Sequence, residues 1–293
     1  MATLFAIAGS FILNSAAFGG MSDTLFVAGT SFGSFEHATR ITIGPQGWVY
    51  IVDVKKNAVF IFTSITEQPS VLGGYGWSAT SFDRPSGVAT DGLNTYISDF
   101  GNHRIQRFDR YSNLLSSLST RDTSYAPARF GYPAGVALST LGDLLILDTE
   151  NLRLVEYSAD SRFERTFGGL STSGGQLQDP VKVCVGGDQY VYVLEKRGIV
   201  EFDYFGNYVR TFAVNLAGEI VGGQATSTGV VAVSADTLFW FNKDGALESS
   251  TALSTLIAEE PVRNAQDVTF DADRMYVLTP IRCQIFRLES LNH

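Results

Sequence analysis

Acidic residues recur at matching places along this chain, each after a short apolar run. They are Asp53, Asp99, Asp148 and Glu195. Arg104 and Arg153 stand five residues after the second and the third of them. A column of carboxylates could bind a cation, but a carboxylate that accepts backbone N–H groups and pairs with arginine also fixes a tight turn. Because an active site occurs once and this pattern repeats, we interpret the column as structural.

The sequence gives little support for a metal site or for a catalytic nucleophile. The histidines are scattered at His37, His103 and His293, a spacing that does not build a zinc site. Cys184 and Cys283 give neither a metal motif nor a disulfide framework, and they fall in different repeats of the chain. We therefore predict two free thiols, no catalytic residues, no metal and no cofactor.

The composition is that of a β-rich, turn-rich chain. Among 293 residues, 12% are aromatic and 17% charged, and 29 glycines stand against 8 prolines. The net charge is −9 and the isoelectric point is about 4.8. A chain this acidic, without a run of lysine and arginine, repels a phosphate backbone. We therefore exclude nucleic acid as a partner.

The N-terminal segment 1–20 carries no charge and is largely apolar from Leu4 to Leu13. It is typical of a secretory signal peptide, except that the usual Lys or Arg before the apolar core is missing. We expect export, to the periplasm or the extracellular space. The alternative is a retained arm that contacts a membrane or a partner, because Thr3–Phe11 is similar to Thr24–Phe32.

One pattern repeats along most of the chain: a large apolar residue is followed three positions later by Pro and six positions later by Val. It spans 82–88, 130–136 and 177–183, with a weaker copy at 35–41. The starts at 35, 82, 130 and 177 are 47, 48 and 47 residues apart, and degenerate copies begin near Ala217 and Val262. Each copy holds short apolar runs separated by Gly, Asn or Asp turns. Units of about 45 residues with four strands are propeller blades, so we predict an all-β, six-bladed β-propeller.

The two ends of the repeat array predict how the ring closes. The sixth copy stops after its third strand, Ile285–Leu288, and a spare strand, Thr24–Ala28, precedes the first copy. We predict that this N-terminal strand becomes the outer strand of the last blade, which holds Val268 and Ile285. Pairing both ends removes the exposed sheet edges and makes residues 21–293 a single domain.

Copies two and three carry a more specific order of residues. In copy two it is Pro85, Gly87, Asp99, Asn102, Arg104, Phe108 and Asp109, and in copy three it is Pro133, Gly135, Asp148, Asn151, Arg153, Tyr157, Phe167 and Gly168. This order resembles the NHL repeat, and the resemblance implies a propeller. NHL-type enzymes use channel histidines for zinc or channel carboxylates for calcium, and RNA-binding members carry a basic face. Those features have no counterpart here, so the family's catalytic residues do not carry over.

The position before the first-strand valine should face the central channel. It carries Arg40, Gly87, Gly135, Lys182, Gly222 and Asp267. Arg40 and Lys182 could form an anion pocket; alternatively, Arg40 pairs with Asp267 across the closure and Lys182 is solvated. A channel-mouth hydrolase or lyase using Arg40, Lys182 and Asp267 is the enzymatic alternative.

Aromatic and arginine residues gather in the connections between copies. They are Tyr75, Trp77, Arg121, Tyr125, Arg129 and Tyr132. Tyr, Trp and Arg are enriched at interaction hot spots, although they could equally wedge neighbouring blades apart. With no catalytic signature present, the sequence favours an exported binding scaffold that docks a protein partner or joins a larger assembly.

Overall fold

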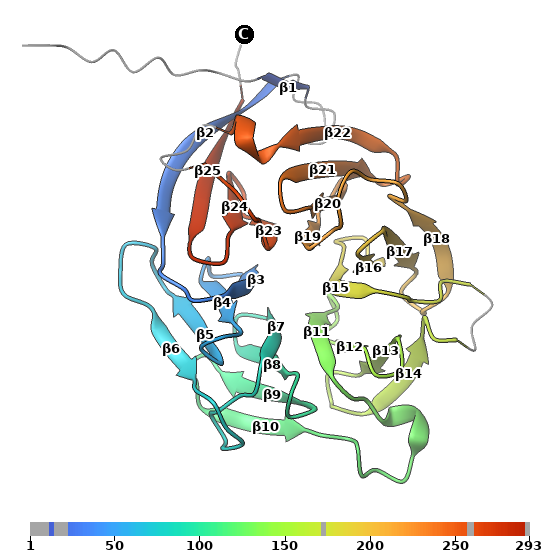
Figure 1. Cartoon of the computed structure of the whole chain (residues 1–293). Helices are drawn as coiled ribbons and strands as arrows, with labels where there is room; N and C mark the ends of the chain where they lie inside the picture. Colours follow the sequence, from blue (N-terminus) through green and yellow to red (C-terminus); the bar gives the residue numbers. More distant parts are fainter. Residues whose placement is uncertain (1–11, 15–22, 171–173, 257–260, 291–293) are drawn as a thin grey trace, which may run out of the picture.

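The computed structural model describes residues 12–14, 23–170, 174–256 and 261–290. Six antiparallel sheets are arranged like propeller blades around a common centre, which is the position expected to be the channel (Figure 1). Five sheets have four strands and the sixth has five. Two short 3-10 turns, η2 (Ala126–Ala128) and η3 (Leu253–Thr255), are the helical elements of the described segments. The predicted six-bladed, all-β architecture is confirmed.

Each blade begins with its strand nearest the channel and proceeds outward. Blade one is β3 (Ala38–Ile43), β4 (Val49–Asp53), β5 (Ala58–Phe62) and β6 (Ser70–Gly73). Blade two is β7 (Pro85–Thr90), β8 (Asn94–Asp99), β9 (Arg104–Asp109) and β10 (Leu114–Leu118). Blade three is β11 (Pro133–Leu138), β12 (Leu144–Asp148), β13 (Arg153–Tyr157) and β14 (Phe163–Phe167).

The second half of the ring repeats this order. Blade four is β15 (Pro180–Val185), β16 (Val191–Glu195), β17 (Gly198–Phe202) and β18 (Tyr208–Phe212). Blade five is β19 (Gly222–Ala225), β20 (Gly229–Val233), β21 (Thr237–Asn242) and β22 (Leu247–Ala252). Blade six is β23 (Asp267–Phe270), β24 (Arg274–Leu278), β25 (Cys283–Ser290), β2 (Asp23–Phe32) and β1 (Ile12–Asn14).

The hydrophobic core is divided among the six spaces between neighbouring blades. Each space holds one cluster of buried apolar side chains contributed by the blades on either side. The second strands β4 and β12 are buried at every position because a neighbouring blade covers each of their faces. Outer strands such as β10 are exposed or half-buried. Blade stacking, rather than any single sheet, therefore removes apolar surface from water.

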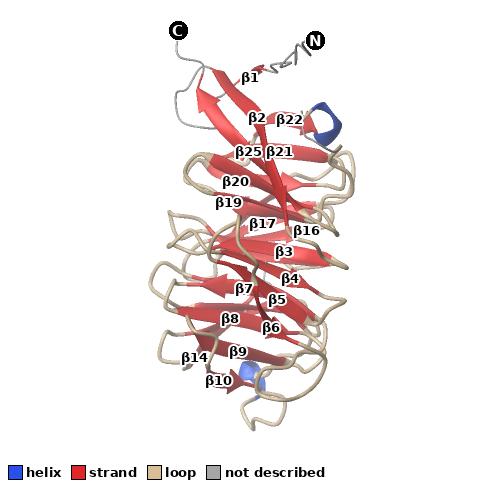
Figure 2. Cartoon of the chain, turned by 90° about the vertical axis from the view of Figure 1, so that its left-hand side faces the viewer, coloured by secondary structure: helices blue, strands red, loops and turns tan. Residues whose placement is uncertain are grey.

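The ring closes through β2, which pairs antiparallel with β25 from Thr24↔Ser290 to Phe32↔Cys283. The predicted position of this N-terminal strand in the last blade is confirmed. The closure interface has a core like the other five, where Phe32 and Phe35 meet Phe62 and Tyr276. Strands from the two ends of the chain thus share one sheet (Figure 2).

The outer edge of β2 carries one further strand. β1 pairs with β2 at Ile12↔Leu25, Leu13↔Thr24 and Asn14↔Asp23. The sequence-based view that closure leaves no free edge for residues 1–20 is therefore wrong, because the edge of β2 itself accepts a strand. The rest of that segment, including Thr3–Phe11, lies outside the described residues.

Loops emerge on two faces of the ring. One face, which we call the connection face, carries the connections between blades and the corners between second and third strands. Its connections include 74–84, 119–132 and the described residues 168–170 and 174–179, and its corners include 54–57, 100–103, 149–152 and 196–197. The opposite face carries the remaining hairpin turns, such as those at Tyr111 and Phe205. No described segment forms a helix of the length and hydrophobicity needed to span a membrane.

Candidate functional site

The inner strands of four blades begin with a β-bulge that fixes what faces the channel. The register of β3 against β4 shifts between Ala38 and Arg40, and that of β15 against β16 shifts between Pro180 and Lys182. β7 and β11 have the same shift. A bulge re-aims the side chain that follows it and leaves one residue out of the ladder. In each of these strands the bulge therefore sets the direction of the residue that follows it. That residue is the one at the channel position, at the end of the strand on the connection face.

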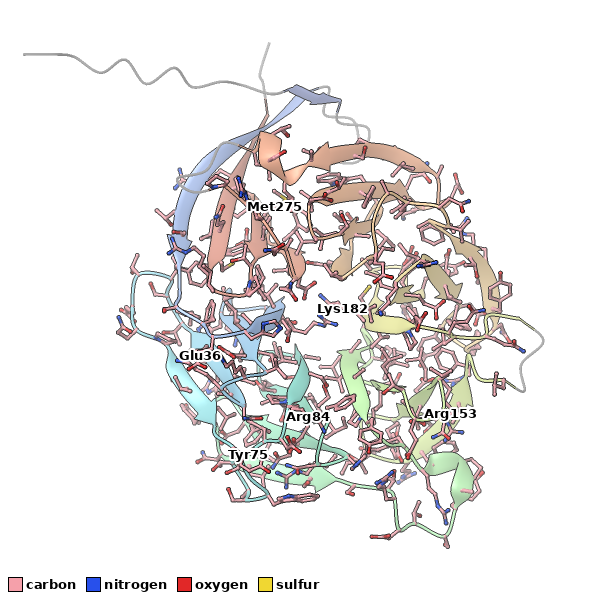
Figure 3. The ribbon with its side chains drawn as sticks, in the orientation of Figure 1. Glu36, Tyr75, Arg84, Arg153, Lys182 and Met275 are labelled. Carbon is pink, nitrogen blue, oxygen red and sulfur yellow. The ribbon has the colours of Figure 1, made fainter. Side chains whose placement is uncertain are left out.

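Three charged side chains of this position meet at the channel mouth. Lys182, which lies at the centre of the ring in Figure 3, donates through Nζ to both oxygens of Asp267, at 2.7 and 2.6 Å. The Asp267 carboxylate is fully buried. It also accepts the backbone N–H groups of Ile41 (3.1 Å), Gly223 (2.9 Å) and Val268 (3.0 Å). One carboxylate thus ties blades one, four, five and six together.

Arg40 completes the cluster, and within the described residues its guanidinium bonds to backbone carbonyls and makes no ion pair. Its guanidinium donates to the carbonyl oxygens of Thr39 (2.7 Å), Val181 (2.7 Å) and Val221 (3.3 Å). Thr39 and Val181 are the bulged residues of their strands, whose carbonyls the ladder leaves available. Burial lowers the pKa of Arg40, and the charge of Asp267 acts in the opposite direction.

Both sequence-based readings of the channel position need correction. The ion pair is Lys182–Asp267, so the expected Arg40–Asp267 pair with a solvated Lys182 is wrong. Arg40 and Lys182 do lie near each other, but their donors point at carbonyl oxygens and at Asp267. Gly222 makes this arrangement possible, because a Cβ there would lie 2.4 Å from Oδ1 of Asp267.

The acidic column at the corners has the structural role expected of it. Asp99 accepts the N–H of Asp83 and pairs with Arg104 at 2.8 Å. Asp148 accepts the N–H of Gly131 and pairs with Arg153 at 3.0 Å. Asp53 binds four backbone N–H groups instead. The carboxylates of Asp53, Asp99 and Asp148 are fully buried. These side chains fix the corners to the connections that precede them.

Two of the predicted interface residues meet in an ordered cluster between blades two and three. Tyr132 N–H donates to Nδ1 of His103 at 3.0 Å, and the two rings lie 4.1 Å apart. The guanidinium of Arg121 lies 5.7 Å from the Tyr132 ring centre and donates to Glu150 at 2.6 Å. Phe100 packs on the other side, 5.1 Å from Tyr132. We call these five residues the Tyr132 cluster.

The other predicted interface residues lie in the connections before blades two and three, on the same connection face. Tyr75 and Trp77 are 77% and 69% exposed, and Figure 3 shows Tyr75 at the rim of the ring. Tyr125 is exposed and its ring contacts Phe163 edge-on. Arg129 donates to the carbonyl oxygen of Thr123 at 2.8 Å. Their exposure does not support the alternative role of wedges buried between blades.

Sequence reasoning missed His103, Glu150 and Phe100 as members of the cluster. A signal for His103 exists in the repeat. Asn57 occupies the same corner position, and its side-chain oxygen accepts the N–H of Arg84, the counterpart of Tyr132, at 2.7 Å. The corner residue therefore reaches the next blade in both cases. Among the described residues, no group of three or more His, Cys, Asp or Glu side chains is placed to hold a metal ion.

The ring of four-stranded blades, its inner bulges and its repeated corner carboxylates define a six-bladed β-propeller. The NHL-repeat family model matches residues 82–108 and 130–157, which lie in blades two and three. The chain is thus a β-propeller with NHL repeats in two of its blades, and the expected resemblance to the NHL repeat is confirmed.

Two curated relatives match half of the chain. The Drosophila melanogaster protein called brain tumor is 30% identical over 149 residues, which are 48% of this chain and 13% of that protein. The B-box type zinc finger protein ncl-1 of Caenorhabditis elegans is 30% identical over 146 residues, which are 48% of this chain and 16% of that protein. The matched region is thus a small part of each relative.

Solved structures share the fold at low sequence identity. A gluconolactonase from Xanthomonas campestris has a TM-score of 0.69 at 16% identity, covering 96% of this chain and 95% of that one. Virginiamycin B lyase from Staphylococcus aureus has a TM-score of 0.61 at 12% identity, covering 91% of this chain and all of that one. At such identities the likeness shows the fold alone.

Proposed function

We propose that this propeller is a non-catalytic binding scaffold that docks another protein on its connection face. The observation that carries the proposal is the Tyr132 cluster, in which aromatic and arginine side chains are accessible yet held in place. Tyr, Trp and Arg dominate binding hot spots, and ordering them beforehand lowers the entropy lost on binding. Tyr132 is also held at φ 46°, and such backbone conformations concentrate at functional sites.

Hot spots gain their energy from a well-packed centre surrounded by contacts that exclude water. Tyr132 supplies the centre, because it packs on His103 and Phe100 and is 38% exposed. Tyr75, Trp77 and Tyr125 supply accessible aromatic surface around it. Arg121 and Glu150 give one charge of each sign at its edge, and such paired charges favour specificity over raw affinity.

Site-specific photo-crosslinking in the native source tests this proposal. A photoreactive phenylalanine replaces Trp77 or Tyr125 in one set of proteins and Tyr111 in the control. Tyr111 is as exposed as Trp77 but lies on the opposite face. We expect one discrete adduct from the connection face that is lost when Tyr132→Ala is added. Equal adducts from Tyr111, or adducts that persist with Tyr132→Ala, would contradict a docking surface there.

The channel cluster does not favour the hydrolase or lyase alternative. An acid, base or electrophile needs a group that can face a substrate, whereas Asp267 accepts hydrogen bonds from Lys182 and three backbone N–H groups. Arg40 in turn is bonded to three carbonyl oxygens. The arrangement is suited to holding four blades in register.

We further propose that the protein is exported. The support is the uncharged character of residues 1–20, in which the apolar run from Leu4 to Leu13 is followed by the small residues Ser15, Ala16 and Ala17, typical of a cleavage site. N-terminal sequencing of the natural protein tests this directly. A start between Phe18 and Ser22 supports export, and a start at Met1 or Ala2 supports the alternative of a retained interaction arm.

A further inference from the structure

The corner of blade four lacks a side chain that blades two and three possess. In the strand register, Asp99 faces Arg104 and Asp148 faces Arg153. The same register places Glu195 opposite Gly198. The corner also shortens, from residues 100–103 and 149–152 to residues 196–197. Blade four therefore keeps the acidic residue and loses its arginine.

The two arginines show what the missing group does. Nε of Arg104 donates to Asp99, and its terminal nitrogens donate to the carbonyls of Trp77, Ser78 and Ser81. Nε of Arg153 donates to Asp148, and Nη2 donates to the carbonyl of Arg129 at 2.7 Å. In each case a planar guanidinium joins a corner carboxylate to the preceding connection. Gln176 is the blade-four counterpart of Ser81 and Arg129.

A pocket of about 460 Å³ lies where blade four lacks the arginine. Its walls come from three elements: the connection before β15, the corner with the start of β17, and the end of β18. The side chains and backbone of Gln176, Asp179, Glu195, Arg197, Gly198 and Val214 are among its lining. This volume is in the usual range for small-ligand sites and exceeds what one guanidinium needs.

Glu195 lines this pocket, and within the described residues one of its two carboxylate oxygens accepts hydrogen bonds. Its Oε1 accepts the N–H groups of Gln178 and Asp179, and within the described part of the chain its Oε2 has no hydrogen-bond donor. Burial raises the pKa of Glu195, the two N–H groups lower it, and the charge of Asp179 raises it. Arg197 and Lys196 both turn toward Glu219, at 3.8 and 3.9 Å. Arg197 also lines the pocket, but among the described residues the ion pairs of both cations are with Glu219 and not with Glu195.

We propose that this pocket binds a guanidinium group supplied from outside the chain, with Glu195 as its carboxylate partner. The ligand group takes the place that Arg104 and Arg153 occupy in their own blades. The proposal does not rest on the proposed docking surface, because the pocket belongs to blade four rather than to the Tyr132 cluster.

The contacts of Arg104 and Arg153 in blades two and three favour a guanidinium over an ammonium ion as the ligand of this pocket. A guanidinium is planar and can bond a carboxylate and a carbonyl at once, whereas an ammonium ion is a compact, strongly hydrated point charge. Val214, at the pocket wall, offers apolar surface on which the methylene stem of an arginine can lie. Asp179 adds a second negative charge to the same wall.

Titration calorimetry and two-dimensional NMR on the purified full chain test the proposal. The probes are N-acetyl-arginine-methylamide, its lysine equivalent and methylguanidinium, each at constant ionic strength. We expect saturable one-to-one binding of the arginine probe in the millimolar range, and at least about tenfold weaker binding of the lysine probe. A short arginine peptide that binds more tightly than methylguanidinium identifies a protein ligand. Equal affinities identify a free guanidino compound.

Two variants remove the site in different ways. Glu195→Gln keeps an acceptor for the two N–H groups but removes the charge. Gly198→Arg restores the arginine of the sister blades, and a Cβ at Gly198 meets its nearest atoms at an ordinary 3.4 Å. We expect each variant to weaken binding of the arginine probe by at least about tenfold. Tyr132→Ala, which lies outside the pocket, is the control that should bind the probe as the parent chain does.

Three results would overturn the proposal: no saturable binding of the arginine probe to the parent chain, lysine bound as well as arginine, or unchanged binding by a folded Gly198→Arg protein. Circular dichroism and the thermal midpoint establish folding of each variant. If Gly198→Arg fails to fold, the Glu195→Gln measurement decides alone. Loss of partner docking with intact probe binding would affect only the proposed function.

Discussion

The backbone N–H of Tyr132 donates a hydrogen bond to Nδ1 of His103 over 3.0 Å, across the boundary between blades three and two. The equivalent boundary between blades two and one uses Asn57, whose Oδ1 accepts the N–H of Arg84 at 2.7 Å. Arg84 and Tyr132 both have positive φ and both precede the first proline of a blade. One device thus occurs twice, once with an acceptor that can be protonated and once with an acceptor that cannot.

This difference predicts a pH-dependent stability that one substitution should remove. Burial and then the charge of Arg121 lower the pKa of His103 in the folded protein. The unfolded chain therefore takes up a proton more readily, below its pKa of about 6.5. The contribution of His103 to stability is complete above that pH and is lost as the pH falls below it. Protonation also removes the acceptor for Tyr132.

The measurement compares thermal midpoints of the parent chain and His103→Asn between pH 7.5 and pH 5. Asparagine keeps an acceptor, as Asn57 does, and has no proton to gain. We expect the midpoint of the parent to fall more steeply below about pH 6.5 than that of the variant. Parallel curves would show that the Tyr132–His103 bond does not depend on the protonation of His103.

Lys182→Met should destabilise the ring by about 3 kcal/mol, because it leaves the buried Asp267 carboxylate without its cation. Asp267→Asn added to Lys182→Met should recover part of the loss, since the unpaired charge is gone. Urea unfolding of the parent, the single and the double variant measures both effects. A single variant as stable as the parent would mean that the pair contributes no net stability.

Closure of the ring by β2 predicts a sharp difference between two truncations. A chain that begins at Asp23 loses β1 but keeps β2 and the closure core, and it should remain folded. A chain that begins at Gly33 loses β2 and the Phe32 side chain of the closure core, and it exposes the edge of β25. Open strand edges promote association, so we expect aggregation or a strongly lowered thermal midpoint. Light scattering and calorimetry compare the two, and similar behaviour would show that β2 is dispensable.

The thiols should react slowly in the native state. Cys184 and Cys283 are both free, as the sequence predicts, and Cys283 is fully buried. Burial raises the pKa of Cys184 to about 11, and it raises the pKa of Cys283 well above the ordinary thiol value. Because the thiolate is the reactive form, iodoacetamide at pH 8 should label neither residue until urea is added. Mass spectrometry before and after urea measures this, and rapid native labelling would contradict the stated burial.

The ring could be predicted from the sequence because each repeat forms one blade, so the number of repeats gives the number of blades. The spacing of the Pro-containing segments and the split last blade led to six blades and to Thr24–Ala28 as the closing strand. The corner carboxylates of Asp53, Asp99 and Asp148 were also interpreted correctly, since repetition favours a structural role. These features depend on local pattern and on simple counting along the chain.

The candidate sites were harder to predict because their contacts cross the ring. Lys182 and Asp267 are 85 residues apart. The local sequence does not indicate whether the Asp267 carboxylate pairs with Lys182 or with Arg40. The contribution of His103 depends on a corner that reaches the next blade. The blade-four pocket lies where a side chain is missing, and this is recognised only when Gly198 is set in register with Arg104 and Arg153.

The pairing of β2 with β25 also has a consequence for how the protein is made. Thr24 and Ser290 are partners in one sheet, so β2 is synthesised long before β25 and cannot pair with that strand until all the intervening blades have been made. Blades one to five can each form from neighbouring segments as they emerge, whereas the sixth depends on the most distant contact in the sequence. Such distant contacts slow folding, and unpaired edges during synthesis invite misassembly. During synthesis, therefore, β2 is the strand that chaperones would need to shield longest.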